Sequence, residues 1–242
     1  MTETRSGYAA WRLIAEELRV DVTDGRIPVG GRLPTEAELA ERFSVNRHTV
    51  RRAVAALAAE GLVTARRGSG TFVASHALLT HRIGTRTRLT ESLGSRSGDV
   101  AGRLLGTAVE APPPDVAAAL QLRGSDALRL EAVRTVSGRP VSRGTHWLDL
   151  DRAPDLGKHF RRTGSITSSL RASGIEDYVR VSTTIGARHA TADELADLEL
   201  SPGAVVLVSR ALGALPGGEP LLYGLTRFPA HLVELDVDHR QF

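Results

Sequence analysis

Residues 33–52 read LPTEAELAERFSVNRHTVRR, and this stretch decides the fold of the first part of the chain. Thr35 is a favoured N-cap residue, and Glu38 follows it three positions later. A threonine and a glutamate at this spacing form a capping box, which opens a helix that we expect to run to about Phe43. Residues 44–46 then make a short connection to a second helix.

The second helix is predicted from residue 47 to about residue 60, with Asn46 as its N-cap and Gly61 as its end. Arg47 and Arg51 are one helical turn apart, so their guanidinium groups project from the same face. The apolar residues lie on a different stripe at helical spacing: Val50, Ala53, Val54 and Leu57. Two helices, a three-residue turn and a basic start to the second helix are typical of a helix-turn-helix that enters the major groove of DNA.

The flanking residues complete a compact unit. A helix is predicted over residues 8–22, where apolar side chains recur at helical spacing. After the helix-turn-helix, residues 62–65 and 71–73 predict two short strands joined by a basic, glycine-rich tip at residues 66–70. Such a hairpin forms a wing whose arginines suit phosphates or the minor groove, and whose glycines let the backbone approach DNA.

These motifs resemble the winged helix of GntR-type transcription regulators over about residues 8–73. The resemblance includes Glu60-Gly61-Leu62-Val63 and Arg67-Gly68-Ser69-Gly70-Thr71-Phe72-Val73. Asn46 stands where the family usually has Ser or Thr, and Ala37 stands where it often has Arg, which removes one contact. Combining resemblance and pattern, the expected DNA-binding residues are Thr35, Glu36, Asn46, Arg47, His48, Thr49, Arg51, Arg66, Arg67 and Gly68.

Composition narrows the class of protein. The chain has 242 residues, a formal net charge of +3 and no cysteine, which excludes disulfide scaffolds, cysteine-ligated metals and thiol catalysis. No apolar stretch is long enough to span a membrane, and the first residues lack the pattern of a secretory signal, so we expect a cytoplasmic protein. His76 and His81 have no third ligand nearby in the sequence, so no metal site is expected. No cofactor is expected either.

The domain organisation predicted from these patterns is a DNA-binding domain at 1–73, a linker at 74–96 and a second domain at 97–242. In the second domain, strand–turn–strand patterns at 126–148 and 204–228 each follow a short helical segment, at 115–120 and 192–198. Their turn residues recur 80 positions apart, as in Gly138 and Gly218. A helix–strand–turn–strand unit used twice predicts an α+β fold on an antiparallel sheet, although hairpins share turn residues for steric reasons and chance is the alternative.

The second domain resembles, more loosely, the effector domain of the HutC branch of the GntR family, which has a chorismate-lyase-like fold. The resemblance covers about residues 95–240 and includes Gly-Ser-Ile-Thr-Ser-Ser at 164–169 and Gly-Glu-Pro-x-x-Tyr at 218–223. Within this branch the sequence is most similar to regulators of phosphonate or phosphate uptake genes, through Arg143-Gly144-Thr145-His146-Trp147 and the motifs around Tyr178 and Tyr223.

The residues of the second domain favour binding of an anion. Residues 164–169 open a helix with several hydroxyls, and arginines lie on the neighbouring strands. Alternation along a strand puts Arg143 and His146 on opposite faces, so both line one pocket only if a bulge or an edge intervenes. Ala132, Gly144 and Leu222 replace the Arg and Glu residues of the family's sugar-phosphate binders, which favours a small, hydroxyl-poor anion. The candidate effector-binding residues are Arg134, Arg143, His146, Ser165, Thr167, Ser168, Arg188 and Tyr223.

The sequence therefore predicts a ligand-responsive transcription regulator, a repressor that binds an inverted-repeat operator as a homodimer and responds to phosphate, a phosphonate or a related anion. One alternative is a HutC-type regulator of a sugar phosphate or an amino-acid catabolite. A second is an enzyme of lyase-like fold, although no nucleophile elbow, paired acid and base, or P-loop is present. A third is an architectural nucleic-acid protein whose second domain only dimerises.

Overall fold

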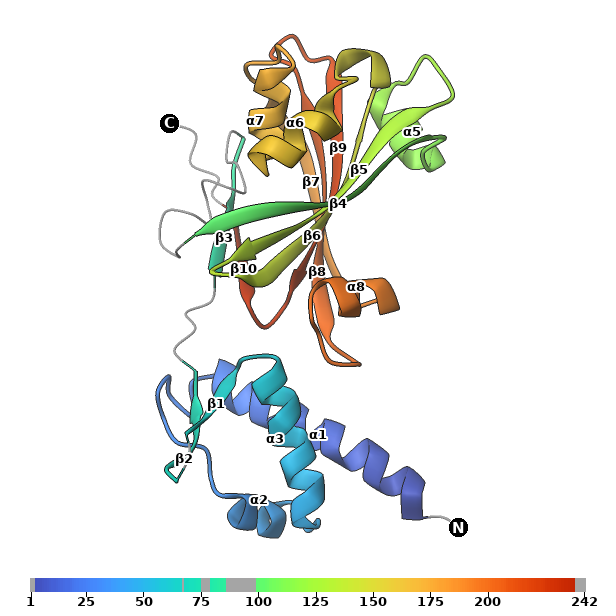
Figure 1. Ribbon diagram of the computed structural model, residues 1–242. Coiled ribbons are helices and arrows are strands. Elements are labelled where there is room, and N and C mark those ends of the chain that lie inside the picture. Colours follow the sequence, from blue (N-terminus) through green and yellow to red (C-terminus); the bar gives the residue numbers. More distant parts are fainter. Residues whose placement is uncertain (1–2, 67, 75–78, 86–98, 238–242) are drawn as a thin grey trace. The chain divides into compact units, whose positions relative to one another are not determined.

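The computed structural model describes residues 3–66, 68–74, 79–85 and 99–237. The chain divides into two compact units, residues 1–77 and residues 78–242, and each unit has its own core (Figure 1). No helix in the described part of the chain is long and apolar enough to cross a membrane.

The first unit is the predicted winged helix-turn-helix. Its elements are α1 (Glu3–Thr23), α2 (Glu36–Arg42), α3 (Arg47–Ala59), β1 (Val63–Arg66) and β2 (Gly70–Val73). The first helix begins earlier than the periodicity predicted. All the helices and the wing pack on one cluster, whose buried members include Trp11, Ile14, Leu18, Leu39, Val50, Ala53, Leu57 and Val63. Apolar residues at helical spacing thus give each helix one buried stripe.

Local capping sets where the two short helices begin. Thr35 Oγ1 accepts a hydrogen bond from the Glu38 amide at 3.3 Å, and the Glu38 carboxylate accepts one from the Thr35 amide at 2.6 Å. Asn46 Oδ1 accepts a hydrogen bond from the Thr49 amide at 2.9 Å and so caps α3. Each cap satisfies amide groups that have no partner inside the helix. The predicted capping box and N-cap are both confirmed.

The wing is an antiparallel pair in which Val63 faces Val73 and Arg66 faces Gly70. The segment before α2 joins it, because the Leu33 amide donates to the Thr71 carbonyl at 2.8 Å. Gly70 has φ of +110°, and a Cβ atom there would lie 2.7 Å from the Arg32 side chain. The positive φ favours glycine at this position, and a larger residue would also displace the Arg32 side chain.

The second unit is built on a six-stranded antiparallel sheet in the order β4-β5-β6-β9-β8-β7, as the α+β prediction requires. The strands are β4 (Val100–Glu110), β5 (Ala127–Val136), β6 (Arg139–Leu148), β7 (Val179–His189), β8 (Val205–Ala214) and β9 (Pro220–Pro229). The helices are α5 (Pro114–Leu120), α6 (Leu156–Thr163), α7 (Ile166–Ala172) and α8 (Ala192–Asp197), with a 3-10 turn at Leu150–Arg152.

The predicted internal repeat is present as two strand–helix–strand–strand units, β4-α5-β5-β6 and β7-α8-β8-β9. They meet at the centre of the sheet with opposite strand order. Thr145 on β6 pairs with Leu225 on β9, and these residues are 80 positions apart, the same spacing as the two hairpin turns. Each half therefore presents equivalent positions to the other across an approximate two-fold axis.

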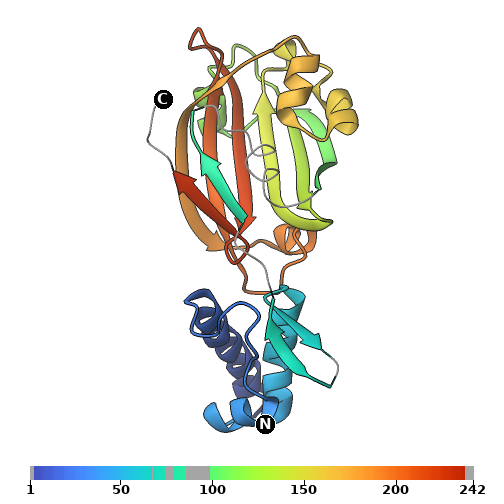
Figure 2. The ribbon, with the colours of Figure 1, turned by 90° about the vertical axis from the view of Figure 1, so that its left-hand side faces the viewer.

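The two faces of this sheet carry different elements (Figures 1 and 2). On one face, α6 and α7 cover one end of the strands, and β3 (Leu79–Ile83) and β10 (Val233–Val237) cover the other end. On the opposite face, α5 packs against Trp147, and Leu198, which caps α8, packs against Val206 and Val208. We call these the α7 face and the α8 face.

The structure revises the predicted linker at 74–96. Leu79–Ile83 is a strand that pairs in parallel with β10, from Leu79 opposite Val233 to Ile83 opposite Val237. His81 and Ile83 are buried, so this stretch belongs to the second unit. The strand could not be predicted from the sequence, because its partner strand lies about 150 residues later in the chain. Residues 75–78 and 86–96 of the predicted linker lie outside the described residues.

Candidate DNA-binding face and effector cavity

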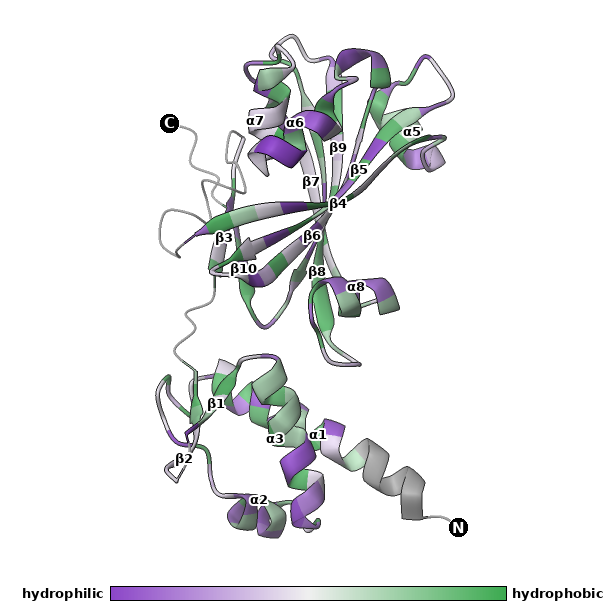
Figure 3. Ribbon diagram, viewed as in Figure 1, coloured by the Kyte–Doolittle hydropathy of each residue, from purple (hydrophilic) through white to green (hydrophobic). Residues whose placement is uncertain are grey.

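The N-terminal end of α3 is exposed and basic. Val50, Ala53 and Leu57 are buried, whereas Arg47, His48 and Arg51 are exposed. Figure 3 shows the same helix as hydrophilic at its start and hydrophobic toward its end. Thr49 is half-buried beside the Asn46 cap. The helix therefore presents Arg47, His48 and Arg51 to solvent near its N-terminal end, as recognition of a major groove requires.

Arg51 is paired with Glu36 from α2. Its Nη2 and Nε atoms donate to the two carboxylate oxygens at 2.8 and 3.1 Å. The Arg51 hydrogen bond lowers the pKa of Glu36 and, reciprocally, that of Arg51 is raised. Glu36 was predicted to contact DNA, and in this structure its carboxylate orients Arg51. Arg47, by contrast, has no hydrogen bond or ion pair with the described residues, so its guanidinium group is available to an outside anion.

The wing places further polar groups at one edge of the first unit. The Arg66 guanidinium lies over the Phe72 ring at 4.7 Å, so the long side chain is held against the hairpin. Gly68 is exposed and has φ of +75°, and no described heavy atom lies within 4 Å of the place that a Cβ atom would take. Arg67, also predicted to contact DNA, lies outside the described residues.

A cavity of about 110 Å³ lies on the α7 face of the second unit. Its wall combines the start of α7, the sheet and strand β3. The lining residues are His81, Arg134, His146, Ser165, Ile166, Thr167, Tyr178, Arg180, Ser209, Ala211, Leu212, Gly213, Leu222, Gly224, Thr226 and Phe228. Cavities of about 150 Å³ accommodate benzene, so this one takes a ligand with a handful of non-hydrogen atoms.

Arg134 is the buried cation of this cavity. Its side chain comes from β5, the residue is 8% exposed, and Nη2 donates to the Gly164 carbonyl at 3.3 Å. No carboxylate in the described part of the chain pairs with it. Burial lowers the pKa of Arg134, because a charge inside the protein loses hydration. A guanidinium in this setting favours an anion in the adjoining space.

The turn between α6 and α7 brings hydroxyl groups to the same cavity. Ser165 Oγ caps α7 by accepting from the Ser168 amide at 3.3 Å, and Thr167 Oγ1 lies 3.2 Å from the Tyr178 hydroxyl. The turn rests directly on β4, since a Cβ on Gly102 would lie 2.0 Å from the Gly164 carbonyl oxygen. The Gly102–Gly164 contact therefore sets the height of Ser165 above the sheet.

Two imidazoles complete the polar lining. His81, from β3, stacks against Phe228 with ring centroids 5.5 Å apart, and His146 comes from β6. Burial lowers the pKa of His81 to about 3 and that of His146 to about 4, and Arg134 contributes to both. Both rings are therefore neutral at physiological pH.

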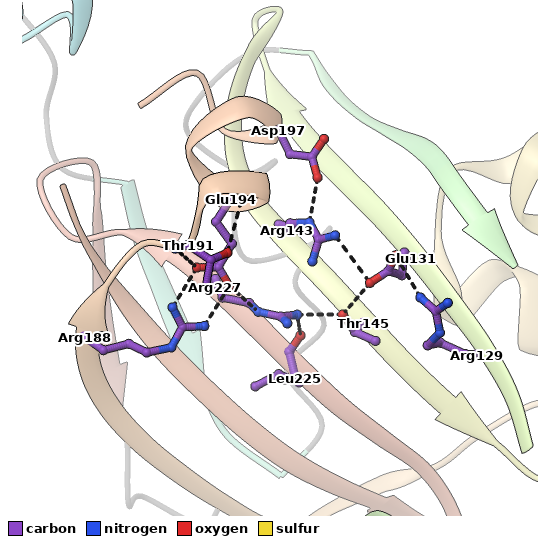
Figure 4. Close-up of polar contacts among 10 residues, drawn as sticks. All are labelled: Arg129, Glu131, Arg143, Thr145, Arg188, Thr191, Glu194, Asp197, Leu225 and Arg227. Atoms are coloured by element: carbon purple, nitrogen blue, oxygen red, sulfur yellow. Dashed lines mark hydrogen bonds and ion pairs between the residues drawn. The ribbon is translucent and has the colours of Figure 1, made fainter. Parts of the chain in front are cut away.

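The structure corrects the predictions for Arg143 and Arg188. Both side chains lie on the α8 face, away from the cavity, and both are paired with carboxylates (Figure 4). Arg143 binds Asp197 at 2.7 Å and Glu131 at 3.4 Å, while Arg188 makes two 2.7 Å hydrogen bonds to Glu194. Strand alternation is the cause, as the separation of Arg143 from His146 already implied.

Glu194 is the centre of this second network (Figure 4). It also accepts from Arg227 Nε at 3.0 Å and from the Thr191 amide at 3.0 Å. Burial alone would raise the pKa of Glu194, but the Arg188 and Thr191 hydrogen bonds and the charge of Arg227 lower it to about 2. The network fixes α8 on the sheet, and each of these arginines has a carboxylate partner within the protein.

Two further predicted residues also lie outside the cavity. Tyr223 points to the α8 face, where it packs against Trp147 and Val116 of α5, and burial raises its pKa. Ser168 is exposed and gives only its amide to the Ser165 cap. Of the eight predicted residues, the cavity brings together Arg134, His146, Ser165 and Thr167.

Sequence reasoning missed five polar residues that line the cavity: His81, Tyr178, Arg180, Ser209 and Thr226. His81 was hidden in the predicted linker. Arg180 was part of a motif used for the family resemblance, and its strand position after Tyr178 was the available signal. The described residues contain no group of three or more His, Asp or Glu side chains that could hold a metal ion.

Comparison with known protein families shows the class of protein to which this chain belongs. Residues 12–73 match the family of bacterial regulatory proteins named gntR, and residues 95–234 match the UTRA domain. These are the winged helix and most of the sheet domain with its cavity. A protein with both is a transcriptional regulator, in which the first domain binds DNA and the second binds a small-molecule effector.

The relatives agree over nearly the whole chain. An uncharacterized HTH-type transcriptional regulator, RB1450 of Rhizobium meliloti, is 39% identical over 98% of both chains. The probable transcriptional regulator PhnF of Escherichia coli is 30% identical over 87% of both chains. The crystal structure of PhnF from Mycobacterium smegmatis superposes with a TM-score of 0.64 over 95% of this chain and all of that one, at 24% identity, which shows a shared fold.

The chain therefore belongs to the GntR family of bacterial regulatory proteins, in the HutC-type group that carries a UTRA domain. The matching families and relatives are regulators rather than enzymes, so the lyase-like alternative is not supported.

Proposed function

We propose that this protein is a repressor that binds an inverted-repeat operator as a homodimer and responds to a small anion, phosphate or a phosphonate, in the UTRA cavity. The observation that carries the ligand class is Arg134, a buried guanidinium that no described carboxylate neutralises, beside the Ser165 and Thr167 hydroxyls. In the neighbouring network every arginine has an acidic partner, so the contrast lies within one domain.

Operator binding is assigned to the exposed start of α3. Arg47 has no partner among the described residues, and Arg51 exchanges Glu36 for DNA at the cost of one exposed ion pair. We expect Arg47→Ala and Arg51→Ala each to abolish specific binding in a gel-shift assay while the dimer persists in size-exclusion chromatography. Arg152→Ala removes the same charge from the second unit and should bind normally. Wild-type affinity in either α3 variant would refute the assignment.

A homodimer through the second unit is supported by strand β7. It is 11 residues long, pairs with β8 and with no other described strand, and has mostly exposed side chains, including Val181 and Ile185. The Arg180 amide at the start of β7 donates to the Thr85 carbonyl at 2.8 Å, and no other described strand pairs with the rest of this edge. Open edges invite pairing with another chain. Analytical ultracentrifugation of wild-type protein and of a Val181→Arg, Ile185→Arg variant tests this, because the charged edge should shift the protein toward the monomer.

Effector response is assigned to the cavity and to strand β3, which begins next to the boundary between the units and contributes His81 to the wall. A ligand that contacts His81 acts on the segment that continues into the DNA-binding unit, and release of DNA is the proposed result. Arg134→Gln should abolish anion-induced release of operator DNA, and Ser168→Ala, at the exposed side of α7, should retain it.

The alternatives make different predictions in a thermal-shift panel of phosphate, methylphosphonate, sulfate, an amino-sugar phosphate and urocanate. Stabilisation by the first two supports the proposal. Selective stabilisation by the amino-sugar phosphate or by urocanate would favour a HutC-type sensor of sugar phosphates or amino-acid catabolites. A flat response would favour an architectural protein whose second domain only dimerises.

A further inference from the structure

We propose that the cavity has a second subsite, formed by His81 and His146, which binds a neutral hydroxyl group on the ligand. The ligand would then be a hydroxylated phosphonate or phosphate monoester rather than a bare anion or an aminophosphonate. The inference rests on the proposed anion site at Arg134 and adds the chemistry of the rest of the ligand.

His81 provides the first half of this subsite. The residue is 3% exposed, and its Nδ1 atom is buried without a hydrogen-bond partner among the described protein groups. Its ring is held against Phe228 and lines the cavity, so it cannot turn to solvent. Buried polar atoms are satisfied by protein, water or ligand, and the His81 ring lines the cavity.

His146 provides the second half, and the sheet is shaped to hold it. Its Nδ1 is also buried without a partner among the described residues. A Cβ on Gly144 would lie 2.7 Å from its Nε2, and a Cβ on Gly224 would lie 3.3 Å from its Nδ1. Gly144 and Gly224 are equivalent positions in the two halves of the sheet. The ring therefore lies flat over two adjacent strands because both positions are glycine.

The charges around the cavity select between polar groups on the ligand. Its described lining includes two guanidinium groups, Arg134 and Arg180, and no aspartate or glutamate. An ammonium group on the ligand would lie near the Arg134 cation with no aspartate or glutamate in the described lining to pair with it, which is unfavourable. A neutral hydroxyl can donate to one imidazole nitrogen and accept from the other, because each neutral ring carries one donor and one acceptor.

Three probes that differ in one group test the subsite by isothermal titration calorimetry on the full chain. Methylphosphonate carries only the acid, hydroxymethylphosphonate adds a hydroxyl, and aminomethylphosphonate adds an ammonium. We expect the hydroxylated probe to bind about 3- to 10-fold more tightly than methylphosphonate, as one or two neutral hydrogen bonds provide. We expect the amino probe to bind at least about 10-fold more weakly than the hydroxylated one.

Variants of the two histidines test whether these residues cause the difference in affinity between the probes. His81→Phe keeps the stacking on Phe228, and His146→Leu replaces the imidazole with an apolar side chain of similar size. Each should reduce the ratio of hydroxymethylphosphonate to methylphosphonate affinity to about one, while methylphosphonate still binds. Gly144→Ala displaces the His146 ring without changing any polar group and should reduce the same ratio. Ser168→Ala should leave the ratio unchanged.

The outcomes separate the two proposals. Equal affinities for the methyl and hydroxymethyl probes, or tighter binding of the amino probe, would overturn the subsite and leave the anion site intact. An unchanged ratio in both histidine variants would also overturn it. If none of the three phosphonates binds, the anion site itself is wrong and the subsite falls with it.

Discussion

Replacing Glu194 with glutamine tests the buried ion network that holds α8 on the sheet. Glu194 is 1% exposed and accepts hydrogen bonds from Arg188, from Arg227 and from the Thr191 amide. Glutamine keeps the shape of the side chain but removes the charge, so Arg227, which is itself buried, loses its only described carboxylate within ion-pair distance.

The magnitude follows from the pKa of Glu194. Its ordinary value is 4.5, and the folded protein lowers it to about 2. That difference corresponds to about 3 kcal/mol of stability when the carboxylate is ionised. Because the folded pKa is the lower of the two, this contribution is complete above about pH 5 and is lost as the pH falls from 4.5 toward 2. At pH 3, roughly 1.4 kcal/mol should remain.

The assay is urea unfolding followed by the fluorescence of Trp147, which is the only tryptophan of the second unit, in a Trp11→Phe background. At pH 7, Glu194→Gln should lower the free energy of unfolding by about 3 kcal/mol, and the deficit should be less than half as large at pH 3. The control is Glu219→Gln, because Glu219 is 65% exposed and pairs with Arg152 at 3.2 Å; its effect should stay within about 0.5 kcal/mol. A deficit below about 1 kcal/mol at pH 7, or one that does not change with pH, would refute the reasoning.

Two further predictions concern backbone contacts. Gly102→Ala places a Cβ 2.0 Å from the Gly164 carbonyl oxygen, so the α6–α7 turn must move. We expect the free energy of unfolding, measured by thermal unfolding, to fall by about 2 kcal/mol or more, and anion binding to weaken. Gly106→Ala is the control, because no described atom lies within 4 Å of the added Cβ, and it should change neither quantity. Asn46→Ala removes the cap of α3 and should lower the free energy of unfolding of the first unit by about 1 kcal/mol, measured by circular dichroism. Asn46→Ser keeps a capping oxygen and should retain most of that stability. Equal stability of all three proteins would contradict the capping role.

Much of the first unit could be predicted from the sequence because its signals are local. The Thr35–Glu38 capping box, the Asn46 cap and the apolar stripe of α3 involve residues within a few positions of one another. The hairpins of the second unit are local too, and their 80-residue repeat predicted two copies of one unit. What the sequence could not show was that β3 exists, because its parallel partner β10 lies at the other end of the chain.

The sequence by itself therefore determined the winged helix, the antiparallel sheet domain and the family to which the chain belongs. Only the tertiary structure decided which arginines are free. Arg134, Arg143 and Arg188 look alike in the sequence, yet Arg143 and Arg188 meet Asp197 and Glu194 on the α8 face, whereas Arg134 enters the cavity on the α7 face. The physical reason is that whether the charge of a side chain is already paired depends on the groups packed around it. For Arg134 and Arg143 those groups come from elements 30 and 54 residues away in the chain, on opposite faces of the sheet.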